Sequence, residues 1–235
     1  MFNKKKVFSI IPAKHYSYQL PKKNYLKLNR LSLFEIAIIC SHKSKYIDST
    51  FVSSDSKYIL NKSKKIGSNT IKRSKKLCLR KTLAKEVIYD AIRFIKKFFF
   101  KDFYIVYMQP TSPFRNHNHV NKAFSLLKKY KLNSLVSVTK NIIPIFKSIK
   151  ISKSLVKPIF KEEFVSLNRQ EFANTYKPNG AIYIFTAANF LRKKNIPIKN
   201  CLAYKMSEKD SMDVDNIKDY KLAKKFSEKL LIYKK

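Results

Sequence analysis

The chain has 235 residues with 45% hydrophobic side chains, which suits one globular domain with a real core. Its 51 Lys and Arg against 15 Asp and Glu give a net charge of +36, which favours anionic partners such as nucleic acid or an acidic membrane surface. The lysines are spread along the whole chain and only 2 Gly accompany them, so biased codon usage explains the charge better, and we expect nucleic acid to bind only non-specifically.

Cysteine usage and hydropathy exclude two further classes. Cys40, Cys78 and Cys201 are odd in number and form no CxxC pair, which argues against a secreted disulfide scaffold. The apolar run that ends at Pro12 is too short for a signal-peptide core, and no later run reaches the length of about 18 apolar residues that spans a membrane. We therefore expect a soluble, cytoplasmic protein without a membrane partner.

Strand-like and helix-like runs alternate along the chain. Short apolar runs predict strands over residues 7–12, 50–53, 104–108, 134–139 and 181–185. Helical spacing of apolar residues predicts helices over residues 31–42, 56–66, 83–98, 120–130 and 216–231. The alternation predicts an α/β fold with a largely parallel sheet between helices. Such sheets bind ligands beyond the carboxyl ends of their strands, so residues that follow strands are the functional candidates.

A polar, basic loop follows the first predicted strand. It contains Lys14, Lys22 and Lys23, whose ammonium groups could neutralise a triphosphate. A solvated loop in a lysine-rich protein is the equally weighted alternative.

The central predicted strand runs into the turn Gln109-Pro110-Thr111-Ser112-Pro113. Two prolines stiffen this turn, and the amide of Gln109 offers donors and an acceptor to the edge of a base. Its place at the carboxyl end of a strand favours function over a simple turn.

Two further groups follow in the second half of the chain. Arg169 and Lys177 could bind a substrate carboxylate, and Gly180, one of only two glycines, marks a backbone that needs positive φ or a close approach.

Asp213 and Asp215 alternate, which places both carboxylates on one side of an extended segment, where Mg²⁺ held partly by phosphates is the natural occupant. The competing interpretation makes Asp215 the N-cap of the last helix.

The remaining ionisable residues indicate no other chemistry. The four histidines show no metal-ligand spacing, and we interpret His117 and His119 as surface residues. No GxGxxG or Walker loop is present.

Taken in order, these segments resemble the acylneuraminate cytidylyltransferases, which include the CMP-sialic acid synthetases and their legionaminate and pseudaminate relatives. The resemblance spans nearly the whole chain. It rests on QPTSPFR at 109–115, SLVSVT at 134–139, NRQ at 168–170, NGAIYIF at 179–185 and SMDVD at 211–215, with a looser match at VSSD, 52–55.

The resemblance implies a Rossmann-like three-layer fold, a homodimer, Mg²⁺, and transfer of CMP from CTP to a nine-carbon acidic sugar. It implies one nucleotidyltransferase domain over 1–235, with 141–178 as a small lobe for dimerisation or substrate binding. Carried over, Lys23 and Asp213 would be catalytic, and Asp213 and Asp215 would hold the metal. The other positions implied for the nucleotide are Lys14, Ser17, Asn24, Arg73 and Gln109, and those for the sugar are Arg169, Gln170, Lys177 and Tyr183.

The first loop departs from the family pattern. Lys14 stands where the family has arginine, Tyr18 where it has a phosphate-binding lysine, and Gln19 where it has glycine. Ser17 slightly resembles the loop of the related octulosonate cytidylyltransferases, which are one alternative. A non-catalytic relative with an altered phosphate loop is another, and a charge-driven RNA-binding protein is a third.

Overall fold

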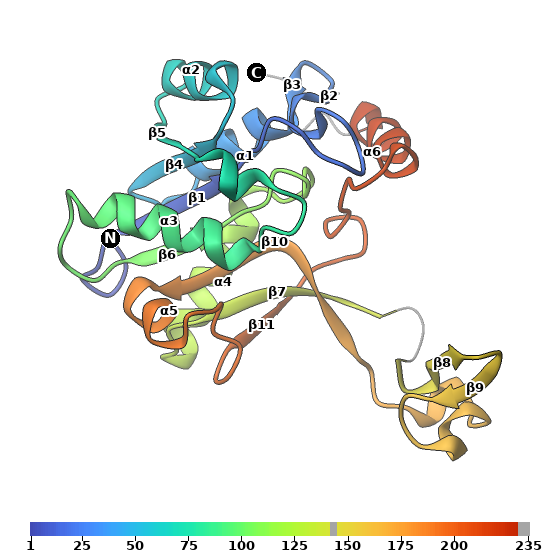
Figure 1. Ribbon diagram of the computed structural model, residues 1–235. Coiled ribbons are helices and arrows are strands. Elements are labelled where there is room, and N and C mark those ends of the chain that lie inside the picture. The colour runs from blue at the N-terminus through green and yellow to red at the C-terminus, as the bar shows by residue number, and fades with distance from the viewer. Residues whose placement is uncertain (142–144, 230–235) are drawn as a thin grey trace.

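The computed structural model describes residues 1–141 and 145–229, which form a seven-stranded sheet between helices (Figure 1). The strand order is β11-β7-β10-β6-β1-β4-β5. Only β10 runs antiparallel to its two neighbours, so the predicted mostly parallel α/β fold is confirmed. The strands are β1 (Val7–Pro12), β4 (Ser49–Ser54), β5 (Asn69–Lys72), β6 (Tyr104–Tyr107), β7 (Leu135–Lys140), β10 (Tyr176–Thr186) and β11 (Leu202–Lys205).

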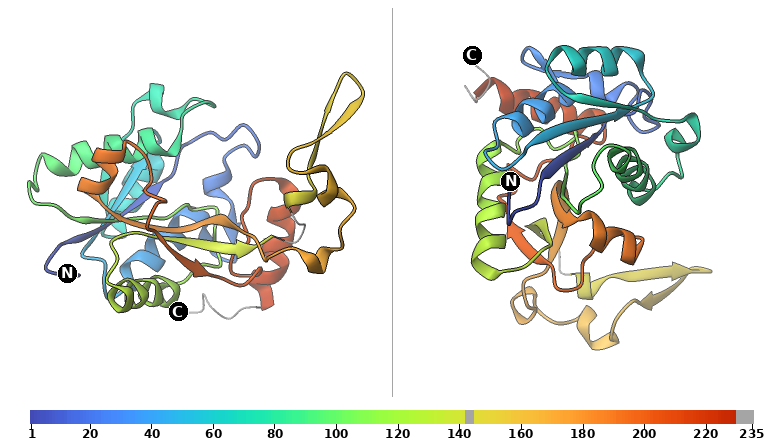
Figure 2. Two further views of the ribbon diagram at one scale, coloured as in Figure 1. Left: turned by 90° about the horizontal axis from the view of Figure 1, so that it is seen from below. Right: turned by 90° about the vertical axis from the view of Figure 1, so that its left-hand side faces the viewer.

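Helices cover both faces of this sheet, which gives the predicted three layers (Figures 1 and 2). They are α1 (Leu33–His42), α2 (Lys57–Lys65), α3 (Ala84–Lys96), α4 (His117–Tyr130), α5 (Ala187–Lys193) and α6 (Ile217–Lys229). Alternation along β1 explains the two cores, because Val7 and Ile11 pack with α1 and α4 while Phe8 and Ile10 pack with α3 and α5.

A third, smaller core lies under α6. Leu28, Leu33, Phe114 and Val214 pack there against Ala223 of that helix. Because Val214 lies between the two candidate metal ligands, this apolar contact fixes the segment that carries both aspartates.

Several elements escaped sequence analysis. The strands β5 and β11 are short, and α5 has only 7 residues, which leaves too few positions for a periodic pattern. The strand predicted over 181–185 begins earlier, because Tyr176 to Pro178 pair with β7 before the register shifts between Pro178 and Tyr183. The predicted helix end at residue 231 lies outside the described residues.

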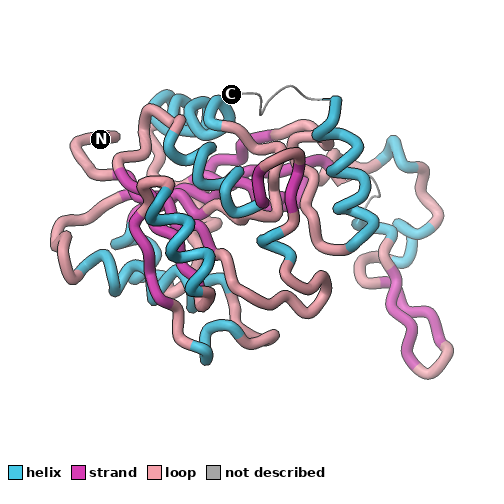
Figure 3. Tube along the Cα trace, turned by 90° about the horizontal axis from the view of Figure 1, so that it is seen from above, coloured by secondary structure: helices cyan, strands magenta, loops and turns pink. Residues whose placement is uncertain are grey.

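The expected lobe projects from the ends of β7 and β10 (Figures 1, 2 and 3). The two chain segments that connect it to the sheet are joined where the backbone N–H of Asn141 donates to the Thr175 carbonyl oxygen at 2.9 Å. It contains the hairpin of β8 (Ile149–Ser152) and β9 (Leu155–Pro158), together with three short 3₁₀ helices, η3 (Ile145–Lys147), η4 (Glu162–Val165) and η5 (Arg169–Glu171). A four-ring cluster holds it together, consisting of Phe146, Phe160, Phe164 and Phe172.

No described helix is long and apolar enough to cross a membrane.

Candidate active site

A cavity of about 430 Å³ lies beyond the carboxyl ends of the parallel strands β1 and β6. The residues that line it come from four segments that are far apart in sequence, namely the first loop, the stretch from Arg73 to Val87, the turn after β6 and the segment before α6. Eight of the residues predicted for the site line this cavity, namely Lys14, Ser17, Lys23, Asn24, Arg73, Gln109, Asp213 and Asp215.

Side-chain hydrogen bonds shape the first loop in place of the absent glycines. The Asn24 amide donates to the carbonyl oxygen of Lys14 at 2.7 Å, and the backbone N–H of His15 donates to Asp55 at 2.7 Å. Lys22 takes the left-handed conformation, with φ of 52°, that a glycine adopts at lower cost. The loop is therefore ordered, and a short 3₁₀ helix, η1 (Lys23–Tyr25), completes it.

Arg73 supplies a fixed positive charge at one wall of the cavity. Its Nε donates to Ser53 Oγ at 3.0 Å and its Nη2 to the Ser53 carbonyl oxygen at 2.8 Å, so the end of β4 holds the guanidinium in place. Burial, and then the charge of Arg73, lower the pKa of Lys14. Positive charges this close to one another favour binding of a phosphate ligand.

The ammonium of Lys14 lies 5.6 Å from the ring centre of Tyr18, the residue that replaces the family lysine. A half-exposed Tyr18 does not line the cavity, whereas Lys14 does. Lys14 therefore brings a positive charge close to the position from which the substitution removed one.

Gly180 makes room for Gln109. A Cβ on Gly180 would collide with the Gln109 side-chain amide, and its φ of +76° also disfavours any other residue. The buried Arg115 fixes the backbone beside this contact, because its Nη1 donates to the carbonyl oxygens of Gln109 at 2.9 Å and Ala181 at 3.0 Å. The requirement for glycine predicted at position 180 is thus a close approach as well as a positive φ.

The two aspartates line the same cavity as these cations. Burial, and then the neighbouring Asp215, raise the pKa of Asp213 to about 6, although a hydrogen bond from Thr111 opposes this shift. Asp213 Oδ1 is buried and has no hydrogen-bond partner among the described residues. Lys23 Nζ lies 2.8 Å from Asp215 Oδ1.

The alternative role of Asp215 as a helix cap is wrong. Asn216 caps α6, because its Oδ1 accepts the backbone N–H groups of Lys218 at 2.9 Å and Asp219 at 3.0 Å. The Asp215 carboxylate is therefore available to the cavity.

These carboxylates fit Mg²⁺. Mg²⁺ usually takes one or two protein carboxylates when substrate phosphates complete its shell, and an unpartnered oxygen on Asp213 with a second carboxylate on Asp215 matches that need. The described residues contain no cluster of three or more His, Cys, Asp or Glu that would form a metal site without substrate.

Residues 8–235 match the cytidylyltransferase family. The chain belongs to that family. The resemblance to acylneuraminate cytidylyltransferases is confirmed by two relatives. The chain is 31% identical to the CMP-N,N'-diacetyllegionaminic acid synthase of Legionella pneumophila, over 95% of this chain and 97% of that protein. It is 29% identical to the N-acylneuraminate cytidylyltransferase of Escherichia coli, over 93% of this chain.

The chain spans about half the length of that E. coli relative, 51%. Among solved structures, the CMP:2-keto-3-deoxy-manno-octonic acid synthetase complexed with CTP superposes with a TM-score of 0.68 at 13% identity, over 96% of this chain and 100% of that one. At this identity the likeness shows the shared fold.

In this cytidylyltransferase the residues predicted for the sugar lie mostly outside the cavity. Arg169 and Gln170 are exposed on η5 of the lobe, and Lys177 is exposed on β10. Tyr183 alone is close, because β10 pairs it with Tyr107 of the cavity wall, and the ring centres are 6.2 Å apart. Burial and the nearby Asp213 raise the pKa of Tyr183.

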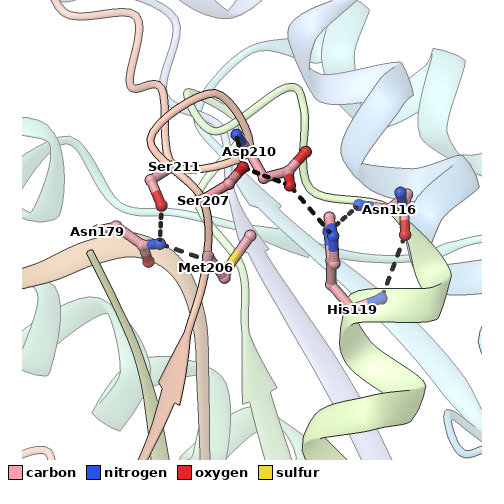
Figure 4. Close-up of polar contacts among 7 residues, drawn as sticks. All are labelled: Asn116, His119, Asn179, Met206, Ser207, Asp210 and Ser211. Carbon is pink, nitrogen blue, oxygen red and sulfur yellow. Dashed lines mark hydrogen bonds and ion pairs between the residues drawn. The ribbon is translucent and has the colours of Figure 1, made fainter. Parts of the chain in front are cut away.

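Asn179 of β10 contacts Ser211 in the segment that leads to Asp213 (Figure 4). Its Nδ2 donates to Ser211 Oγ at 2.8 Å, and its Oδ1 accepts from Ser137 Oγ at 2.5 Å and from the Ala181 N–H at 3.2 Å. The residue thereby ties the β10 bulge beside Gln109 to the aspartate segment. Asn179 was not among the predicted site residues, and the signal that could have identified it is the adjacent Gly180.

His119 is not the surface residue that we expected (Figure 4). Its side chain is 15% exposed, and its Nε2 lies 3.7 Å from Asp210 Oδ2. The Nδ1 atom accepts the Asn116 N–H at 3.2 Å, which assigns that nitrogen as unprotonated. Burial lowers the pKa of His119, so a neutral imidazole caps α4 beside the loop that leads to Asp213.

Proposed function

We propose that this cytidylyltransferase transfers CMP from CTP to a nine-carbon 2-keto acid sugar, sialic, legionaminic or pseudaminic acid, and releases pyrophosphate. The observation that carries the proposal is a single cavity in which Lys14, Lys23 and Arg73 face the carboxylates of Asp213 and Asp215. The names of the two relatives support the acceptor class.

The reaction forms a bond between the anomeric oxygen of the sugar and the α-phosphorus of CTP. The bond from that phosphorus to the bridging oxygen breaks, and pyrophosphate leaves with the electron pair. Lys14, Lys23 and Arg73 stabilise the negative charge that develops on the departing phosphates. Lys23 has to exchange its pairing with Asp215 for the triphosphate, which frees that carboxylate.

Bound at Asp213 and Asp215, Mg²⁺ would supply charge neutralisation at the phosphates. Asp213 is buried in a cavity wall and has its pKa raised to about 6, so it is largely ionised at neutral pH. Its free Oδ1 can then hold the cation or take the proton of the attacking hydroxyl. Gln109, held between Gly180 and the Arg115-fixed backbone, orients the ligand in the cavity.

We also propose a homodimer formed through the lobe. Six apolar side chains of the lobe are between 43% and 73% exposed, namely Ile149, Ile151, Leu155, Val156, Ile159 and Phe160. A second copy that covers them could also contact Arg169 and Gln170, which are exposed on the same lobe. Light scattering across protein concentrations tests the mass directly.

We place the protein in the cytoplasm because the three cysteines, Cys40, Cys78 and Cys201, are free thiols.

The test of the function is pyrophosphate release from CTP with Mg²⁺ and each candidate acid in turn. Octulosonic acid belongs in the panel, because a buried Ser17 lines the cavity in the loop that slightly resembles the octulosonate enzymes. Release with a nine-carbon acid supports the proposal. Release with octulosonic acid alone, or with none of them, refutes it.

A further inference from the structure

The connection between α3 and β6 exposes two phenylalanines at one extremity of the molecule. Phe98 is 73% exposed and Phe100 is 83% exposed. Phe99, between them, turns inward and packs on Phe8 and Phe103, with ring centres 5.5 Å and 6.0 Å apart. The anchored middle residue therefore leaves its two neighbours outside the core.

Composition alone does not account for this arrangement. The chain has 18 phenylalanines, and all lie within the described residues. After this pair, Phe160 is the most exposed at 44%, and the fold buries the others at least in part. Biased codon usage explains why phenylalanine is common, but it does not explain two exposed phenylalanines at one tip.

Basic residues flank the two rings. Lys96 and Lys97 precede them and Lys101 follows, and none of the three pairs with a carboxylate among the described residues. The one acid beside them, Asp102, is already engaged by Lys5 Nζ at 2.5 Å and by the Ala188 N–H at 2.9 Å. The tip is thus apolar at its centre and positive around it.

The tip lies at the far end of the molecule from the nucleotide cavity. Ala84, at the start of α3, lines the cavity, and Lys96 ends the same helix, which separates the two by about 18 Å of helix rise. The connection lies beside the N-terminal residues in two views, away from the lobe (Figures 1 and 2). A surface bound at the tip would leave the cavity and the lobe accessible.

We propose that this tip, residues 96–101, docks the protein on the surface of an anionic phospholipid bilayer. Exposed aromatic rings enter the boundary between headgroups and acyl chains, and the surrounding lysines meet the negative headgroups. Such binding would be peripheral and would need no spanning helix, and it goes beyond the expectation of no membrane partner.

Two other occupants fit the tip less well. A second copy seated tip to tip would bring the flanking lysines Lys96, Lys97 and Lys101 of both chains together, with no carboxylate between them to offset their charge. Single-stranded nucleic acid stacks on aromatic rings, but it uses a groove that tracks the backbone, whereas these rings stand uncovered at an extremity.

The test compares binding to vesicles of phosphatidylcholine alone with binding to vesicles that also contain phosphatidylglycerol, at about 0.1 M salt. The variant Phe98→Ser/Phe100→Ser removes the rings and keeps the lysines. The control Tyr58→Ser/Tyr130→Ser removes two aromatics that are 58% and 55% exposed elsewhere on the molecule. Thermal melting and CTP binding confirm that each variant is folded, since neither pair lines the cavity.

We expect the parent protein to bind anionic vesicles only, and the Phe98/Phe100 variant to bind them about tenfold more weakly or worse, with the control unchanged. Equal vesicle binding by both variants and the parent, or no vesicle binding by the parent, overturns the proposal. The proposal is also overturned if the Phe98/Phe100 variant loses binding to polyadenylate RNA as strongly as it loses binding to vesicles, because that result would assign the rings to base stacking.

Discussion

The cavity and the lobe of this cytidylyltransferase are built in opposite ways. Around the cavity, buried polar groups join distant segments, as when the Val214 N–H donates to the Thr111 carbonyl oxygen at 2.8 Å. In the lobe, every residue of β8 and three of the four residues of β9 are exposed. The cavity therefore takes its lining from one chain, while the lobe presents outward an apolar surface and Arg169 and Gln170, two of the residues predicted for the sugar.

The largest effect on activity is expected from a substitution at Asp213 in the cavity. We expect Asp213→Asn to lower kcat/KM by about a thousandfold or more, because it removes a carboxylate that we propose holds the Mg²⁺ that would neutralise the phosphates. Folding should not suffer. A folded-state pKa of about 6 means that the ionised carboxyl opposes folding above that pH, so the melting temperature at neutral pH should stay the same or rise.

The matched control is Asp210→Asn, in the same segment but outside the cavity lining. A rate for Asp213→Asn within a few-fold of the parent would contradict the metal assignment.

The next largest effect concerns the cations of the first loop. Lys23→Ala should reduce kcat/KM by about a hundredfold, because we propose that Lys23 makes the main phosphate contact with Lys14 in support. Tyr18→Lys should tighten CTP binding by returning a point charge to the family position. The rate of pyrophosphate release measures the first effect, and calorimetric titration with CTP measures the second. An unchanged rate and an unchanged CTP affinity in Lys23→Ala would remove Lys23 from the phosphate site.

The pH dependence sharpens the role of Asp213 further. A cation must displace the Asp213 proton, so apparent affinity for Mg²⁺ in the presence of CTP should fall about tenfold per pH unit below pH 6. Stability of the metal-free protein should change the other way. The raised pKa contributes stability below the unfolded value of 3.8, and that contribution is lost as pH rises through about 6. Asp213→Asn should remove both slopes, and their persistence in this variant would assign them elsewhere.

The two glycines give a matched pair. Gly67→Ala and Gly180→Ala should each cost about 1 kcal/mol or more in stability, because both residues have positive φ, +89° and +76°. Only Gly180→Ala should also weaken substrate binding, since its Cβ would displace Gln109 whereas that of Gly67 meets only His42 Cε1 at 3.9 Å. Equal binding by both variants would show that Gln109 is not positioned in this way.

The smallest effect on stability is expected in the lobe. Leu155→Asp/Val156→Asp should change the free energy of unfolding of the monomer by less than about 0.5 kcal/mol, because both side chains are more than 60% exposed, at 64% and 61%. The same change should abolish dimerisation measured by light scattering. A dimer that survives the substitution would place the interface away from β9.

Much of the fold and of the nucleotide end was predictable from sequence. The strand over residues 7–12 reads as one apolar run buried on both faces, and its observed bounds agree with the prediction. Lys14, Gln109 and Asp213 follow strands or precede a helix, and parallel topology brings such positions to one edge. Periodicity and topology therefore sufficed to locate the cavity.

What sequence analysis missed depends on contacts without local periodicity. His119 was assigned to the surface because a histidine at a helix start is usually exposed, yet long-range packing places it against Asp210. Strand β10 begins five residues before the predicted start because a bulge and Pro178 interrupt its alternation. The position of Arg169 relative to the cavity depends on how the lobe projects, and no local pattern encodes that.

The most direct test of the central claim follows the phosphorus of CTP itself. Phosphorus NMR of CTP, Mg²⁺ and N-acetylneuraminic or N,N'-diacetyllegionaminic acid with the protein distinguishes the triphosphate from a CMP phosphodiester and free pyrophosphate. We predict that the phosphodiester and pyrophosphate appear in equal amounts and that Asp213→Asn suppresses both. If CTP binds but its three resonances persist with every acid in the panel, the cavity holds nucleotide without catalysing transfer.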